Sequence, residues 1–142
     1  MSDQPGARNN TSTVVRRKPI AQVMTKDVVT VTRDGTLAVI CQLMGTHGVG
    51  SIIVVDGHRP IGIITERDLV NRVLLDHNPK KPFRAKEIMS TKLFTISSES
   101  KIIDVIHLMR KHGCRHVPVV DDDGNLVGIV TQSDIIREME VE

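Results

Sequence analysis

The sequence predicts a mixed α/β fold made of two similar repeats, each with the element order β-α-β-β-α. A shift of 65 residues places Met24 on Met89 and His47-Gly48 on His112-Gly113. Within each copy, β-branched apolar runs alternate with segments of helical apolar spacing. Each copy also closes with the pattern Gly-x-x-Thr-x-x-Asp, at residues 62–68 and, after one inserted residue, at residues 128–134. These matched features predict an internal duplication.

Length and composition favour a globular protein. A chain of 142 residues, 39% hydrophobic and 25% charged, suits one compact domain or two small units that share a core. Repeats of about 55 residues are small, so we expect them to pack sheet to sheet about a pseudo-twofold axis, with the helices outside. No apolar run approaches the roughly 18 residues of a membrane span, and the N-terminus lacks an apolar signal region. We therefore expect a cytoplasmic location and no membrane association.

The charge argues against a nucleic-acid partner. A net charge of +2 is mild, and Phe83 and Phe94 are the only aromatic residues available for base stacking. A weaker hypothesis remains, in which the basic triplet at residues 16–18 helps to bind a single strand. A solvated segment also explains that triplet.

Four segments are predicted along the chain. Residues 1–18 are polar and without periodicity, which is typical of a disordered tail. Residues 19–75 form the first repeat and residues 85–142 the second. Residues 76–84 form a polar linker that contains two prolines.

Each repeat is predicted to begin with a short helical turn, a strand and a helix. The turns are residues 20–24 and 85–89, and the strands are residues 28–31 and 93–96. Apolar residues at helical spacing then predict the helices: Leu37, Ile40, Cys41 and Met44 in the first copy, and Ile102, Val105, Ile106 and Met109 in the second. Gly48 and Gly113 are predicted to end these helices in a left-handed conformation.

The second half of each repeat is predicted to be a hairpin followed by a helix. The first hairpin strands are residues 51–55 and 116–120, and turns at residues 56–58 and 122–125 lead into the strands that end at Thr65 and Thr131. An amphipathic helix follows each threonine. Cys41 and Cys114 align with apolar residues of the sister copy, so we interpret both as buried thiols, with a disulfide or a nucleophile as the alternatives.

The closing motif supports two interpretations. A threonine at a helix start lies beside unpaired amides, so it can bind an anion, and the ionised Asp68 and Asp134 can accept hydrogen bonds from ribose hydroxyls. The same spacing is a capping box, in which threonine and aspartate bond each other's main-chain amides and contribute roughly 1 kcal/mol to stability. From the residues alone, both interpretations stay open.

The sequence gives little support for an enzymatic function. The sequence has no nucleophile that can be placed beside a base, no phosphate-binding Gly-x-x-x-x-Gly-Lys loop and no zinc-ligand spacing. Residues 121–125 do not fit a calcium loop, because Val119 and Val130 would occupy ligand positions. His47 and His112 recur in the last turn of a helix, where the dipole favours them, although a metal or a switch is the alternative. We therefore predict neither an enzyme nor a metal site.

The element order, the Met24-Thr25 and Met89-Ser90 pairs and the two closing motifs resemble the CBS domain family, whose tandem pair is called a Bateman module. The resemblance runs from about residue 20 to residue 139. It implies a non-catalytic regulatory module, used for example in energy sensing, that binds AMP, ADP, ATP or S-adenosylmethionine in clefts between its repeats. It also implies assembly into homodimers.

The resemblance also implies two binding sites. One would comprise the following residues: Thr25, Val29, Val49, Gly50, Ile129, Thr131 and Asp134. The other would comprise these: Ser90, Phe94, Cys114, Arg115, His116, Ile63, Thr65 and Asp68. Because Arg115-His116 stands where the first copy has Gly50-Ser51, we expect the Asp68 site to favour the more highly charged phosphate. The Asp134 site should prefer a weakly charged group or stay empty.

The predicted function is therefore that of a sensor. A nucleotide would stabilise one arrangement of the repeats or of a dimer, and a separate, unidentified effector protein would detect the change. The alternative is a ligand-independent dimerisation or interaction scaffold, in which the closing motifs are only helix caps.

Overall fold

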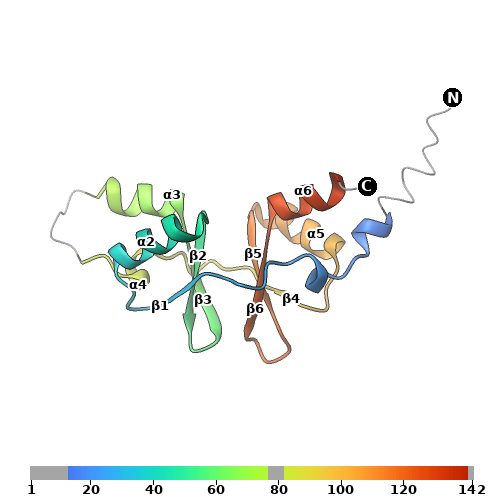
Figure 1. Ribbon diagram of the computed structural model, residues 1–142, viewed down its shortest axis with the longest axis horizontal. Coiled ribbons are helices and arrows are strands. Elements are labelled where there is room, and N and C mark those ends of the chain that lie inside the picture. The colour runs from blue at the N-terminus through green and yellow to red at the C-terminus, as the bar shows by residue number, and fades with distance from the viewer. Residues whose placement is uncertain (1–12, 77–81, 141–142) are drawn as a thin grey trace. The chain divides into compact units, whose positions relative to one another are not determined.

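The computed structural model describes residues 13–76 and 82–140, which fall into two compact units (Figure 1). The first-repeat unit comprises Asp27–Leu93 and Gly124–Leu126. The second-repeat unit comprises the segment up to Lys26, Phe94–Asp123 and the chain from Val127 onwards. Each unit holds one three-stranded sheet with helices packed on it, so the fold class is mixed α/β, as predicted.

The sheet of the first-repeat unit contains β1 (Thr30–Thr32), β2 (Ser51–Asp56) and β3 (Arg59–Thr65) in that order. β1 lies parallel to β2, and β2 pairs antiparallel with β3. The predicted first strand began at residue 28, whereas β1 begins two residues later. The pairing with β2 explains the difference, because the parallel register starts at Thr30 opposite Ile53.

The helices of this unit are α2 (Leu37–His47), α3 (Glu66–Leu69) with its π-helical continuation η2 (Val70–Leu74), and α4 (Ala85–Ile88). Gly48 ends α2 with φ 62°, the left-handed conformation that the sequence predicted. Ile40 and Met44 of α2 pack on the sheet, and Ala85 and Ile88 of α4 are fully buried in the same core. The start of the second repeat therefore contributes to the core of the first-repeat unit.

The sheet of the second-repeat unit contains β4 (Ile96–Ser97), β5 (His116–Val120) and β6 (Leu126–Thr131) in that order. Its helices are α5 (Ile102–His112) and α6 (Gln132–Glu140). β4 is only two residues long, so Leu93 and Phe94, predicted in the strand, lie ahead of it. The core is formed by these apolar residues: Ile20, Ile96, Ile102, Val105, Val117, Val119, Val130 and Ile135.

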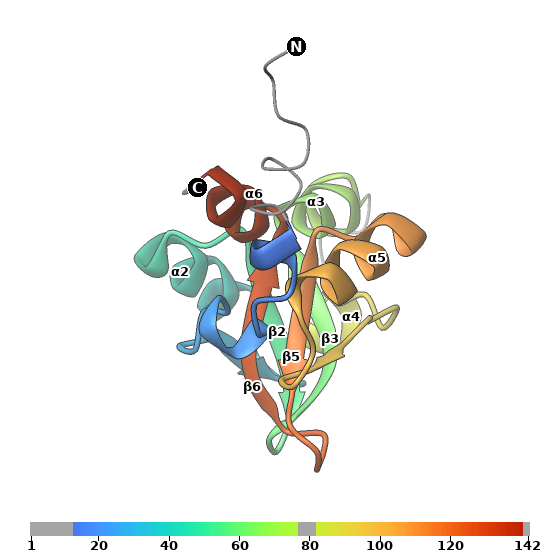
Figure 2. The ribbon, with the colours of Figure 1, turned by 90° about the vertical axis from the view of Figure 1, so that its right-hand side faces the viewer.

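The N-terminal segment completes this second core. Ile20, in the 3-10 turn η1 (Ile20–Gln22), is fully buried, and its amide donates to the Ser100 carbonyl at 2.8 Å. Lys18 forms an ion pair with Glu138 of α6. Figure 2 shows this segment, in blue, beside the red helix α6. The start of the first repeat thus packs in the core of the second-repeat unit.

Two expectations need correction or restriction. Residues 1–12 of the predicted tail lie outside the described part of the chain, whereas residues 13–16 form a helical turn whose Val15 packs on the second core. Cys41, predicted to be buried, is exposed on α2, because the apolar face of that helix turns Ile40 and Met44 inward instead. Among the described helices, none combines the length and apolarity needed to cross a membrane.

Candidate functional site

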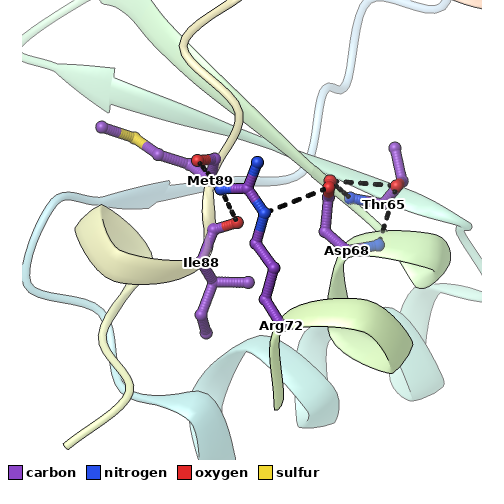
Figure 3. A network of polar contacts seen from close by, with 5 residues as sticks. All are labelled: Thr65, Asp68, Arg72, Ile88 and Met89. Carbon is purple, nitrogen blue, oxygen red and sulfur yellow. Dashed lines mark hydrogen bonds and ion pairs between the residues drawn. The ribbon is translucent and has the colours of Figure 1, made fainter. Parts of the chain in front are cut away.

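Thr65 and Asp68 form a complete capping box at the start of α3 (Figure 3). The Thr65 amide donates to Asp68 Oδ2 at 2.8 Å, and the Asp68 amide donates to Thr65 Oγ1 at 3.3 Å. The Thr65 hydroxyl also donates to Asp68 Oδ2 at 3.0 Å. One carboxylate oxygen of Asp68 is therefore used in stabilising the helix start.

The second closing motif repeats this geometry at the start of α6. The Thr131 amide donates to Asp134 Oδ2 at 2.8 Å, and the Asp134 amide donates to Thr131 Oγ1 at 3.2 Å. The capping interpretation is thus correct in both copies. The amides of Glu66 and Gln132 are also engaged, since they donate to the Gly50 and Arg115 carbonyls at 3.1 and 2.9 Å. The helix amides that the sequence suggested as phosphate donors are largely used within the fold.

The other oxygen of each aspartate faces an arginine. Asp68 Oδ1 lies 3.9 Å from Arg72 Nε, and Asp134 Oδ1 lies 3.4 Å from Arg137 Nη1. The two carboxyl side chains keep 17% and 13% of their surface exposed. Because a carboxylate oxygen accepts more than one hydrogen bond, each Oδ1 can accept a ligand hydroxyl while Oδ2 caps the helix. Capping and ribose binding are therefore compatible.

Arg72, which the sequence analysis did not single out, connects Asp68 to the chain that enters the second repeat. Its Nη1 donates to the carbonyls of Ile88 and Met89 at 3.2 and 2.8 Å (Figure 3). These carbonyls lie at the end of α4, next to the predicted site residue Ser90. The i, i+4 spacing of Asp68 and Arg72 is the sequence feature that points to this ion pair.

The Met-Thr and Met-Ser pairs pack against the glycines of the closing motifs. A Cβ on Gly62 would lie 2.6 Å from Met89 Sδ, and one on Gly128 would lie 2.5 Å from Met24 Sδ. A side chain at either position would force the methionine to shift, so glycine lets the methionine lie directly against the main chain. This close approach lets Ser90 pair with Ile63, and Thr25 with Ile129, through mutual main-chain hydrogen bonds of 2.9 to 3.0 Å.

These pairings bring part of each predicted site together within one unit. In the first-repeat unit, Ile63, Thr65, Asp68 and Ser90 gather around the end of β3. In the second-repeat unit, the matching residues are Ile129, Thr131, Asp134 and Thr25. Each predicted site also draws on the other unit. Val29, Val49 and Gly50 belong to the first-repeat unit, and Phe94, Cys114, Arg115 and His116 belong to the second. The complete grouping stays a prediction.

His116 at the start of β5 interacts electrostatically with Asp134 of its own repeat. Burial lowers the pKa of His116 below its ordinary value of 6.5, and the charge of Arg115 lowers it further, while Asp134 opposes the shift. The imidazole is therefore biased towards its neutral form. An added anionic group nearby would favour protonation.

Cys114 is half-buried against the second core, and burial raises the pKa of its thiol. A thiol with a raised pKa is a poor nucleophile, so the packing interpretation suits Cys114. Cys41 instead lines an open pocket of about 450 Å³ between α2 and α3, together with these residues: Met44, Gly45, Gly48, Val49, Gly50, Glu66 and Leu69. Val49 and Gly50, predicted to contact the ligand, thus lie at a concave surface.

Two α/β repeats that each end in a capped Gly-x-x-Thr-x-x-Asp motif define a tandem-repeat protein of the kind that the sequence predicted. The chain belongs to the CBS domain family: the model of the CBS domain matches residues 20–75 and again residues 85–141.

Several known proteins are similar to this chain. An uncharacterised protein from Methanopyrus kandleri is 37% identical over 124 residues, which cover 87% of this chain and 63% of that protein. The CBS domain of a CBS domain-containing membrane protein from Sphaerobacter thermophilus superimposes with a TM-score of 0.83 at 28% identity, covering 96% and 97% of the two chains. CBSX2, solved in complex with AMP, has the same fold, with a TM-score of 0.75 at 18% identity over 84% of this chain and 95% of its own.

Proposed function

We propose that this chain is a regulatory module that binds an adenosine-containing ligand of the AMP, ADP, ATP or S-adenosylmethionine type. The main support for the proposal is that the two carboxylate oxygens of Asp68, and likewise of Asp134, have different roles. Oδ2 caps a helix, whereas Oδ1 lies outside the capping box. Vicinal ribose hydroxyls are matching donors for such an oxygen. The AMP complex of the structurally similar CBSX2 supports the same class of ligand.

The phosphate would be bound by side chains rather than by helix amides, because the amides of Glu66 and Gln132 already donate within the fold. Arg115 offers an exposed guanidinium, and His116 gains a proton more readily when an anion approaches. Gly50 occupies the equivalent place in the first copy and brings no charge. We therefore propose that the site containing Arg115 and His116 takes the more highly charged nucleotide.

The regulatory step would be non-catalytic. A ligand that binds one arrangement of the chain better than another shifts the population towards it, by no more than its difference in affinity for the two. A separate effector protein would detect this shift. The chain spans 63% of the length of the Methanopyrus relative and 43% of the length of a relative from Methanocaldococcus jannaschii.

Thermal unfolding in the presence of each ligand tests the proposal. A ligand at about 100 times its dissociation constant adds close to 2.7 kcal/mol to the free energy of unfolding, which raises the midpoint by several degrees. We expect such a rise with at least one of AMP, ADP, ATP and S-adenosylmethionine. Unchanged midpoints with all of them would contradict the proposal.

A second candidate is a ligand-independent homodimerisation scaffold. Its support is that both capping boxes are complete, so the closing motifs already have a structural role. In addition, Leu74 and Leu75 near the end of the first repeat are 74% and 61% exposed, an apolar surface that a second copy could cover. This candidate predicts a dimer in analytical ultracentrifugation whose stability is unaffected by adenosyl ligands.

A further inference from the structure

His112, three residues before the proposed phosphate-binding Arg115, stacks its ring on that of Phe94. The Phe94 and His112 ring centroids are 3.8 Å apart, and the ring planes differ by only 14°. His112 is the last residue of α5, and Gly113 then reverses the chain with φ 66°. Phe94 lies in the irregular segment ahead of β4. The ring contact therefore joins the end of α5 to the segment ahead of β4.

The stack with His112 restricts the orientation of the Phe94 ring. The imidazole covers one face of the phenyl ring, and Phe94 remains half-buried rather than fully enclosed. An aromatic ring whose orientation is fixed loses little freedom when a base stacks on its other face, so the contact costs less entropy. Arg115 follows His112 by three residues. One turn of the chain thus supplies a support for a base platform and a cation for phosphate.

The first repeat provides an internal comparison. His47 occupies the equivalent place at the end of α2, before Gly48, but the residue equivalent to Phe94 is Val29, which has no ring to stack. The helix dipole explains a histidine at both positions. It does not explain the ring contact, which belongs to the copy that also has Phe94 and Arg115.

We infer that His112 is a positioning residue that holds Phe94 as the stacking surface for the base of a purine nucleotide. This inference rests on the proposed function and deepens it, because it assigns the recognition of the base to one repeat. The equivalent surface of the first repeat, with Val29 and His47, would contact a base less strongly.

Calorimetric titration of the full chain with AMP tests the inference through three variants. His112→Ala should weaken AMP binding about threefold to tenfold, the range expected for loss of one aromatic pair. His112→Phe restores a ring at this position and should bind within about twofold of the unaltered chain. His47→Ala, the matched control, should leave the affinity unchanged.

Two further measurements separate positioning from general stability. The His112→Ala and His47→Ala variants should both remain folded at the temperature of the titration, and His112→Ala should have the lower unfolding midpoint because it alone loses a ring contact. In nuclear magnetic resonance spectra, the His112 ring protons should move when Phe94 is changed to Leu. AMP affinity that stays unchanged in His112→Ala, or falls equally in His47→Ala, would overturn the inference alone. Absence of binding of AMP, ADP, ATP and S-adenosylmethionine by the unaltered chain would overturn the proposed function and the inference with it.

Discussion

At the scale of single residues, the two aspartates show how one side chain serves structure and binding. Oδ2 of Asp68 and of Asp134 accepts main-chain hydrogen bonds, while Oδ1 faces an arginine at 3.9 or 3.4 Å. Replacement by alanine therefore removes a helix cap together with any ligand contact. Replacement by asparagine retains an oxygen for the cap and is the more informative change.

The glycine of the first closing motif gives a prediction of stability. Gly62→Ala places a Cβ 2.6 Å from Met89 Sδ, and the collision should lower the free energy of unfolding by about 1–3 kcal/mol. Gly45→Ala is the matched control, because a Cβ at this helix position would meet no neighbouring atom within 4 Å. The control should raise stability by roughly 0.5–1 kcal/mol. Chemical denaturation measures both, and equal effects would contradict the assigned role of Met89.

His116 gives a prediction of pH dependence. Its folded-state pKa is lowered, so the folded protein favours the neutral imidazole and the unfolded chain binds the proton more readily. The contribution of His116 to stability is therefore fully present above pH 6.5 and is lost as the pH falls through the lowered folded-state pKa. Urea denaturation of the unaltered chain should show this loss, and His116→Gln should reduce it. Identical pH profiles for the two would contradict the shift.

At the scale of elements, the sequence predicted local structure well but not which core each segment joins. Thr65, Thr131, Gly48 and Gly113 lie at the helix ends where their chemistry favours them. Apolar spacing identifies the face of a segment that is buried, but it carries no information about the partner. For that reason the packing of Ile20 on the second core, and of Ile88 on the first, could not be predicted.

Ile20 and Ile88 each pack in the core of the unit formed mainly by the other repeat, and this arrangement gives a pair of predictions that control for each other. Ile20→Ala and Ile88→Ala each remove a fully buried side chain and should cost about 2–5 kcal/mol. Hydrogen exchange should show the loss of protection from Ile20→Ala in α5, β5 and β6, although residue 20 lies at the start of the first repeat. Ile88→Ala should instead affect α2, β2 and β3. The observed cores would be contradicted if Ile20→Ala reduced protection only in α2, β2 and β3, or if Ile88→Ala reduced it only in α5, β5 and β6.

At the scale of the whole molecule, the two repeats share a fold but differ in residue type at several equivalent positions of the predicted binding sites. The sequence identified the repeats, the family and the aspartates, because these depend on residue type and spacing. It did not identify Arg72 as a link to the Met89 carbonyl, or the stack of Phe94 on His112, because both depend on how distant segments approach. The differences between the copies, Arg115 against Gly50 and Phe94 against Val29, favour unequal affinities for a ligand.

The central claim is tested most directly by calorimetric titration of AMP into the unaltered chain and into Asp68→Asn and Asp134→Asn. Hydrogen bonds to a charged acceptor contribute roughly 1.5–3 kcal/mol, so at least one variant should bind about tenfold or more weakly while its unfolding midpoint stays close to that of the unaltered chain. Equal AMP affinity in all three proteins, or no binding of AMP, ADP, ATP or S-adenosylmethionine by the unaltered chain, would contradict the account.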